Sequence, residues 1–439
     1  MTTATSVGFP PTEPLTQLTS PPPWKQTFSS LKVRNYRIFA LSNLIAMTAM
    51  WMARIAQDWL VLELSGSVTA VGITVALQFA PMLVFGLLGG VIVDRYPKRT
   101  LLMICQSIAV LTSATLAALV LTGTVEVWHI YLSALVLGFV TVVDNPARQS
   151  FTGEMVGPFH LRNAISVNSS TFQVGALIGP ALSGALLVAV GAGWSFGLNA
   201  LGCAFVVVSL ARLRTSELYR TPSMPRERGQ LRAGIRYVSS KPAILYTIVI
   251  MGFLAVFGQN LPVILSAYAK DVFGVGAAGY GVFNTLVAVG ALTGALLSTR
   301  RRGFGLRGIV VAALCYSLVQ TVSGLMPTEE SFAVALAAVG LTWLLFITLA
   351  NSLVQLSSNA GVRGRVMALY VLVLLGGQSI GGPLMGLVVE HFGAQTGMLV
   401  SGGVPLVAVA VIGVVLARRG LLAKPGTPGR GLSAPGLTA

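Results

Sequence analysis

The amino-acid sequence predicts an all-α membrane protein with twelve transmembrane helices, arranged as two six-helix pseudo-symmetric bundles. Three observations predict this: the composition, long stretches without charged residues, and the position of the basic residues. Of 439 residues, 54% are hydrophobic and only 10% are charged, and the mean hydropathy is +0.80. Soluble domains carry about 25% charged residues. The composition therefore excludes a soluble enzyme, a disordered chain and a secreted disulfide scaffold.

The predicted helices are the stretches of sequence that lack Asp, Glu, Lys and Arg, since a helix needs about 20 apolar residues to cross a bilayer. The stretch 163–211 holds two helices because Gly191, Ala192 and Gly193 interrupt it, and each other stretch holds one. The stretches are 38–53, 64–93, 100–125, 127–143, 163–211, 242–269, 272–299, 308–328, 331–362, 366–389 and 392–417.

The basic residues predict the orientation of the chain in the membrane. The formal net charge is +16, from 29 basic and 13 acidic residues. If both termini are cytoplasmic, all basic residues except Arg54 and Lys270 fall in the segments on the cytoplasmic side. This distribution matches the positive-inside rule. The positive charge is therefore explained by topology, and no nucleic-acid partner is expected.

The chain is expected to divide into two bundles with a polar linker between them. Small motifs recur between the two halves: Gly86-xxx-Gly90 as Gly290-xxx-Gly294, and Gly179-Pro180 as Gly382-Pro383. Paired halves around a central site are a common plan in transporters. The expected segments are a disordered tail and interfacial helix (1–34), an N-terminal bundle (35–211), a cytoplasmic linker (212–241), a C-terminal bundle (242–418) and a disordered tail (419–439).

The loop between the second and third predicted helices mixes glycine with charge. Gly90 allows close helix contact, and Asp94, Arg95, Lys98 and Arg99 follow it at the membrane edge. One interpretation is a gating latch that breaks and re-forms as the halves move. The other is an ordinary positive-inside loop with a single acidic residue.

The fifth predicted helix carries small residues at a spacing of four or five, together with a proline. Gly175, Gly179 and Gly184 are suited to a close helix contact, and Pro180 removes one backbone hydrogen bond and bends the helix. Ordinary helix packing is the alternative explanation of this pattern.

Four segments resemble the major facilitator superfamily over roughly residues 30–418. Residues 90–99 resemble its motif A, and residues 175–184 resemble its motif C, which is associated with antiporters. Residues 144–148 and 363–367 are similar to the branch that holds enterobactin-type exporters and macrolide or multidrug efflux pumps.

The resemblance implies a role for acidic and basic residues at the cytoplasmic ends of the helices. It implies that Asp144 joins a charge relay with Asp94 and with Arg95 or Arg99, and acts as a gate. A solvated helix end is the alternative. The expected latch residues are Gly90, Asp94, Arg95, Lys98, Arg99, Asp144 and Arg148.

Arg54 and Asp58 lie inside the first predicted helix, where ionisable groups are costly and often functional. They are four residues apart, so they share a helix face and can form an ion pair. Both are candidates for proton coupling, in which protonation of Asp58 weakens its pairing with Arg54. The alternative is an interfacial ion pair in which Arg54 extends outward.

Polar and aromatic residues within the predicted helices are candidates for the wall of a mostly apolar substrate cavity. For each of the polar residues, an interhelical hydrogen bond is the alternative. The candidates are Trp51, Gln57, Phe253, Phe257, Gln259, Asn260, Asn284 and Gln378.

These features predict a secondary active transporter in a bacterial cell inner membrane, and they predict no enzyme, cofactor or metal site. The expected activity is export of an amphipathic small molecule, drug-like or siderophore-like, by proton antiport with alternating access, by a monomer. The resemblance associates this branch with multidrug resistance. A facilitator or proton symporter that imports a nutrient and a non-transporting membrane sensor are the alternatives.

Overall fold

The computed structural model describes residues 29–219, 230–298, 305–359 and 362–422. The expected tails and the centre of the expected linker fall largely outside these residues.

The described chain is almost wholly helical. The first half contains η2 (Ser29–Lys32), α1 (Arg34–Ser65), α2 (Val68–Arg95), α3 (Lys98–Leu121), α4 (Val127–Ala189) and α5 (Ala192–Ala211). The linker contains η3 (Thr215–Glu217) and α6 (Gln230–Ser240). The second half contains α7 (Pro242–Phe253), η4 (Leu254–Gly258), α8 (Leu261–Ala267), η5 (Tyr268–Val272), α9 (Gly276–Ser298), α10 (Leu306–Ser323), α11 (Glu329–Leu356) and α12 (Arg363–Arg418).

The helices that are long and apolar enough to cross a membrane number 10 in the described residues, with 242–272 counted as one. Two of them are double. The 63-residue α4 turns back at Gly157 (φ 67°), and the 56-residue α12 turns back at Gly393 (φ 85°). Only glycine adopts such left-handed backbone angles at little cost. The structure is therefore consistent with twelve crossings. The turn at Gly157 is tighter than the gap between the stretches 127–143 and 163–211 predicted, and the turn at Gly393 lies next to the short gap between 366–389 and 392–417.

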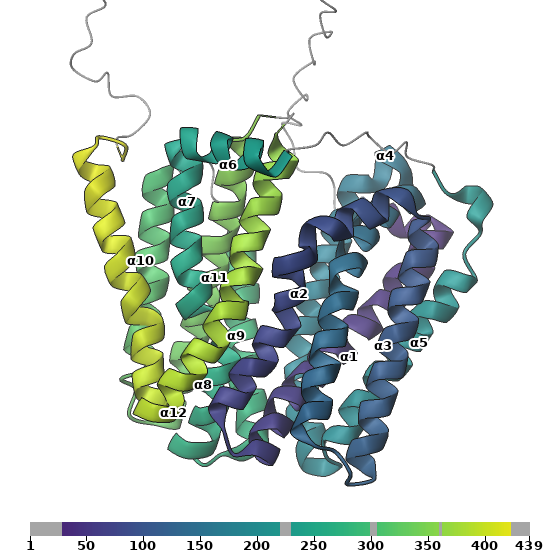
Figure 1. Ribbon diagram of the computed structural model, residues 1–439, viewed down its shortest axis with the longest axis horizontal. Helices are drawn as coiled ribbons and strands as arrows, with labels where there is room; N and C mark the ends of the chain where they lie inside the picture. Colours follow the sequence, from purple (N-terminus) through teal and green to yellow (C-terminus); the bar gives the residue numbers. More distant parts are fainter. Residues whose placement is uncertain (1–28, 220–229, 299–304, 360–361, 423–439) are drawn as a thin grey trace, which may run out of the picture.

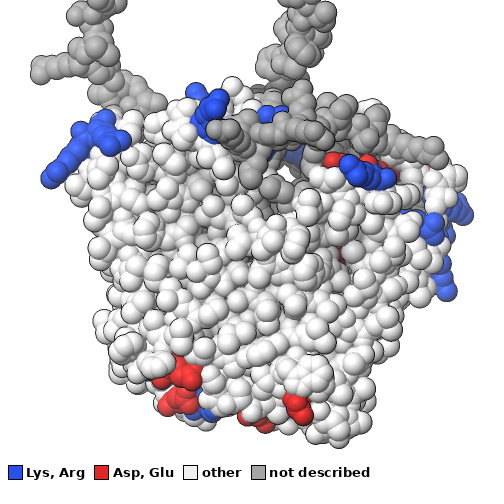
Figure 2. Space-filling model, in the orientation of Figure 1, with Lys and Arg blue, Asp and Glu red and all other residues white. Residues whose placement is uncertain are grey.

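The two halves lie side by side, with α1–α5 in one and α7–α12 in the other (Figure 1). On the face shown in Figure 2, Lys and Arg side chains gather mainly at the end of the molecule that carries α6, and Asp and Glu side chains lie mainly at the opposite end. Following the positive-inside rule, we call the basic end the inner end and the acidic end the outer end.

Glycines allow corresponding helix pairs to approach closely in each half. A Cβ at Gly290 would lie 1.8 Å from the carbonyl oxygen of Ala337, so α9 and α11 are in backbone contact. In the first half the equivalent contact is made by Gly89, whose Cβ would lie 2.0 Å from the carbonyl oxygen of Val142. Gly86, which the repeat matches to Gly290, has the side chain of Met82 in its own helix as the nearest neighbour of a Cβ. Three residues turn about 300° around an α-helix, so the two glycines point about 60° apart, and the packing of α2 places Gly89 against α4.

The seventh crossing is interrupted, as the Gln259-Asn260-x-Pro262 pattern suggests. A π-helical turn ends at Gly258, and Gln259 and Asn260 leave helical geometry. The carbonyl of Gly258 instead accepts hydrogen bonds from the Tyr316 hydroxyl (2.8 Å) and from Gln320 Nε2 (3.1 Å). Irregular backbone in a membrane is tolerated where neighbouring groups satisfy it in this way.

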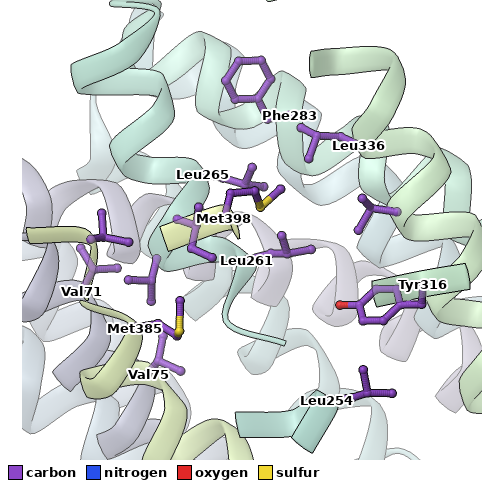
Figure 3. Close-up of a cluster of buried hydrophobic side chains, with 14 of the residues drawn as sticks. Val71, Val75, Leu254, Leu261, Leu265, Phe283, Tyr316, Leu336, Met385 and Met398 are labelled. Atoms are coloured by element: carbon purple, nitrogen blue, oxygen red, sulfur yellow. The ribbon is translucent and has the colours of Figure 1, made fainter. Parts of the chain in front are cut away.

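The main hydrophobic core crosses from one half to the other. Val71 and Val75 of α2 lie beside Met385 of α12 and near Leu261 of α8 (Figure 3). All four belong to one cluster of buried side chains that also fills the second half. The two halves are therefore held together at this level by direct apolar contact.

Candidate functional site

Two contacts between the halves close the outer side of the protein. In the first, which we call the α2–α12 seam, a Cβ at Gly72 would lie 2.3 Å from the carbonyl oxygen of Gly382, and one at Gly386 would lie 2.8 Å from Cα of Thr69. In the second, the α4–α9 seam, a Cβ at Gly281 would lie 2.7 Å from Cα of Gly184. Any side chain at these glycines would meet backbone.

The outer rim of the α2–α12 seam also carries a charged contact. Glu390 Oε2 accepts hydrogen bonds from the Ser67 hydroxyl (2.6 Å) and from the Thr69 backbone N–H (2.8 Å). The carboxylate thereby caps the first turn of α2, where the helix dipole favours negative charge. The rim contact adds a charge-assisted link to the glycine contacts.

Asp58 lies at the α4–α9 side of this closed region. Its side chain is 1% exposed, and its Oδ2 accepts a hydrogen bond from the Tyr280 hydroxyl in the opposite half (3.2 Å). The other carboxylate oxygen, Oδ1, has no hydrogen-bond partner among the described residues. The Tyr280 ring stacks on Trp59, with ring centroids 5.9 Å apart. A buried carboxylate with one free oxygen is well suited to holding a proton.

Arg54 does not form the ion pair that its spacing from Asp58 allows. Its guanidinium lies over the ring of Phe79 (4.8 Å to the centroid) and near that of Trp51 (5.7 Å), and no described ion pair joins it to Asp58. Cation–π contact with the two rings occupies the guanidinium, while Tyr280 occupies the carboxylate. The described residues therefore show no direct ion pair between them, although both groups remain on one helix face and interact electrostatically.

The cavity candidates do not converge on one pocket. Phe253 and Phe257 line an apolar pocket of about 430 Å³ between α2, the seventh crossing and α12, together with Leu83, Val249, Gly252, Val256, Leu372, Val373, Gly376, Gly377 and Ile380. Ring-sized apolar groups fit a pocket of this volume.

The other six candidates lie outside that lining. Gln259 bonds to the Tyr316 hydroxyl (3.3 Å) in a neighbouring helix, as the alternative interpretation predicted. Asn260 instead donates to the carbonyl of Val256 in η4, and Asn284 donates to the carbonyl of Tyr280 one turn earlier in α9. Trp51 packs edge-on against Phe172. Gln57 is buried with an unpartnered Nε2, and Gln378 is half-buried.

The expected charge relay is replaced by a network inside the first half. Arg148 donates two hydrogen bonds to Asp144 (2.9 and 3.0 Å) and one to Asn43, and Gln106 donates to Asp144 Oδ1 (2.9 Å). The described contacts of Asp144 include neither Arg95 nor Arg99. Among the described contacts, the carboxylate of Asp144 is instead paired with Arg148, one helical turn along the same helix.

The latch segment is anchored to the first half at two of its basic residues. Arg99 donates to the carbonyls of Leu210 and Ala211 at the end of α5, and Lys98 pairs with Glu154 (3.0 Å). Asp94 and Arg95 are exposed at the end of α2 beside Gly90. Opening and closing of the latch is not tested by these contacts and stays a prediction.

Replacing Arg148 by Met should strongly destabilise the protein. The Asp144 carboxylate, 7% exposed, would lose its ion pair while staying buried, which typically costs about 3–5 kcal/mol. Thermal unfolding of the purified protein measures this. The matched control is Arg214→Met, which removes an exposed ion pair to Glu217 and should change stability little. Equal melting temperatures for the two variants would contradict the structural role of the network.

The glycines of the fifth crossing serve helix packing within and between the halves. Gly175 approaches Met47 and Gly179 approaches Trp51, where a Cβ would lie 2.5 Å from the Trp51 Cβ. Beyond Pro180, Gly184 forms the α4–α9 seam with the second half. The packing interpretation therefore accounts for Gly175 and Gly179, and Gly184 has a further role in closing the outer side.

Sequence reasoning missed two residues that join the halves, Tyr280 and Glu390. Glu390 carried a signal, since it is an acidic residue between two charge-free stretches. Tyr280 had none, because its partner Asp58 is 222 residues away in the chain.

Comparison with known proteins identifies the family. The transmembrane secretion effector family, of the major facilitator type, matches residues 25–424. The chain belongs to this family. It is similar to the enterobactin exporter EntS of Citrobacter koseri and to EntS of Escherichia coli, each 26% identical over 400 residues that cover 90% of this chain and 94% of the relative.

Solved structures show the same fold for this major facilitator protein. A bacterial homologue of the human lysosomal transporter Spinster, in an inward-facing and unoccupied conformation, has a TM-score of 0.71 at 15% identity and covers 90% of this chain and 98% of its own. A D-xylose–proton symporter has a TM-score of 0.65 at 15% identity and covers 86% and 96%. The chain is thus a multi-pass membrane protein with the fold of secondary transporters.

Proposed function

We propose that this transporter exports an amphipathic small molecule in exchange for protons, by alternating access. The observation that carries the proposal is the Asp58 carboxylate, which is buried at the contact between the halves and bonded across it to Tyr280. In that place, the exposure of the carboxylate to the outer solution depends on the relative position of the halves. Similarity to an enterobactin exporter supports outward transport.

Alternating access follows from the two seams. In the described arrangement Gly72–Gly382 and Gly184–Gly281 contacts hold the outer side closed. Opening the outer side separates these backbones and breaks the Asp58–Tyr280 hydrogen bond, which exposes the carboxylate to a proton from outside. Each proton moved across 100 mV supplies about 2.3 kcal/mol. That energy drives export of a solute against its gradient.

The pocket at Phe253 and Phe257 supports a substrate with an apolar body. The residues that line it are aliphatic, aromatic or glycine, so recognition there depends on shape and apolar contact. A hydrophilic nutrient needs fixed polar anchors, and this pocket supplies none in its lining. The alternative of a nutrient importer is therefore less well supported by the described residues.

Everted membrane vesicles test the proposal directly. Acidifying the vesicle interior should drive uptake of lipophilic drug and siderophore probes from a panel, and a protonophore should stop it. Accumulation of probe that is unaffected by the protonophore would exclude proton antiport. Accumulation only in right-side-out vesicles would identify an importer instead.

Replacing Phe253 by Ala should weaken binding of aromatic substrates about tenfold, the equivalent of about 1.4 kcal/mol. The ring lines the pocket and is 37% exposed, so its loss removes part of the contact with the substrate. Titration of the purified protein with a probe transported in the vesicle assay gives the dissociation constant. Phe205→Ala is the matched control, because Phe205 is 48% exposed on α5, outside the pocket lining. Equal affinities in all three proteins would remove the pocket from the substrate path.

A further inference from the structure

Tyr280 is held in place by four contacts at the junction of the halves. It is 0% exposed, its hydroxyl donates to Asp58 Oδ2, and its ring stacks on Trp59 of α1 at an interplanar angle of 30°. Its backbone carbonyl accepts a hydrogen bond from Asn284 (2.8 Å). The neighbouring residue, Gly281, is pressed against Gly184 in the α4–α9 seam.

The hydroxyl of Tyr280 therefore reaches Asp58 only while the α4–α9 seam is closed. Tyr280 belongs to α9 in the second half, and Asp58 belongs to α1 in the first. Movement of α9 away from α4 carries the hydroxyl away from the carboxylate. The other ionisable group that interacts with Asp58 is Arg54, which lies one turn earlier on the same helix and stays nearby whatever the halves do.

From this geometry we propose that Tyr280 is the positioning residue that makes the proton affinity of Asp58 depend on which side of the transporter is closed. This inference rests on the proposed proton antiport. A donated hydrogen bond stabilises a carboxylate more than a carboxylic acid. Closure of the outer side adds this hydrogen bond, which favours the ionised form of Asp58, whereas burial by itself favours the protonated form. Arg54 is constant between the two states, so Tyr280 is the charge-stabilising contact that closure adds, and it promotes release of the proton from the buried carboxyl.

The variant that isolates the hydroxyl is Tyr280→Phe, which keeps the ring stacked on Trp59. The titration of the Asp58 carboxyl is followed by infrared difference spectroscopy of the purified protein, with Asp58→Asn as the subtraction reference. Loss of one hydrogen bond to a charged group should raise the titration midpoint by about one pH unit. The pH at half-maximal proton-driven flux should move upward with it.

Tyr316→Phe is the matched control. Tyr316 is equally buried in the same half, and its hydroxyl donates to the Gly258 carbonyl, away from Asp58. The titration midpoint of Asp58 in the Tyr316→Phe protein should equal that in the wild type. A Tyr316→Phe shift as large as that of Tyr280→Phe would mean a non-specific effect and would overturn the proposal.

A second variant guards against misfolding of Tyr280→Phe. Incorporation of 3,5-difluorotyrosine at position 280 keeps ring and hydroxyl but makes the hydroxyl a stronger donor, so the midpoint should move downward. Unchanged midpoints in both variants would overturn the role of Tyr280, even with proton-driven flux intact. Absence of proton-driven flux in the wild type would instead overturn the proposed function, and this inference with it.

Discussion

Replacing Asp58 by Asn is expected to abolish proton-driven transport. Asn has nearly the same shape, and its carbonyl oxygen can still accept the Tyr280 hydrogen bond, so the seam should close normally. The side chain no longer binds a proton, however. At 100 mV one proton supports an accumulation ratio of about 50-fold, and this ratio should fall to about one in the variant.

Reconstituted liposomes with an imposed proton gradient measure this ratio. Exchange of labelled for unlabelled substrate at equal pH on both sides is recorded in parallel, and it should persist because it needs no net proton movement. Asp271→Asn is the control, since Asp271 is exposed at the outer end in η5. If Asp58→Asn retains gradient-driven accumulation with an unchanged pH profile, the carboxylate is structural.

Replacing Gly72 by Ala is expected to prevent full closure of the outer side. The new Cβ would lie 2.3 Å from the carbonyl oxygen of Gly382 and 2.7 Å from its carbonyl carbon. Both are backbone atoms that no rotamer change can move, so α2 and α12 must separate. Overpacking of this kind costs about 1–3 kcal/mol, which lowers the outer-closed population by about 5- to 150-fold and the transport rate with it.

Spin labels at Ser65 and His391 measure the closure, because both residues lie at the outer ends of helices on opposite sides of the α2–α12 seam. The distance between the labels should increase in Gly72→Ala. The labelling background replaces Cys105, Cys203 and Cys315, the three native cysteines.

The matched control for this variant is Gly197→Ala. A Cβ there meets nothing within 4 Å, so the label distances and the transport rate should match those of the wild type. A Gly72→Ala protein with wild-type distances and transport would show that the seam is not required for the cycle.

The repeat between the halves could be predicted only in part from the sequence. Gly290 and Gly294 both meet the backbone of α11, as their spacing predicts. In the first half the contact falls on Gly89 instead of Gly86. A glycine-rich segment offers several glycines in a row, and only the rotation of α2 against α4 decides which of them touches.

The candidate site divides in a similar way. The sequence pointed to Asp58 because a carboxylate in an apolar helix is rare and costly. It also suggested Arg54 as the partner, since residues four apart share a face. The spacing along one helix predicts which groups can form a contact. It does not include the groups on other helices that compete for the same contact. Tyr280, Phe79 and Trp51 proved to be those competitors.

The sequence by itself determined that this protein crosses the membrane many times, which end carries the positive charge and where the helices break. These properties follow from the cost of placing charged and unbonded polar groups in hydrocarbon, and that cost acts on each segment separately. Only the tertiary structure decided the partners: Tyr280 for Asp58, Arg148 for Asp144 and Gly382 for Gly72. Two of these contacts join residues on different helices, and in the third several charged groups could have reached the same carboxylate. All three therefore depend on the relative placement of whole helices.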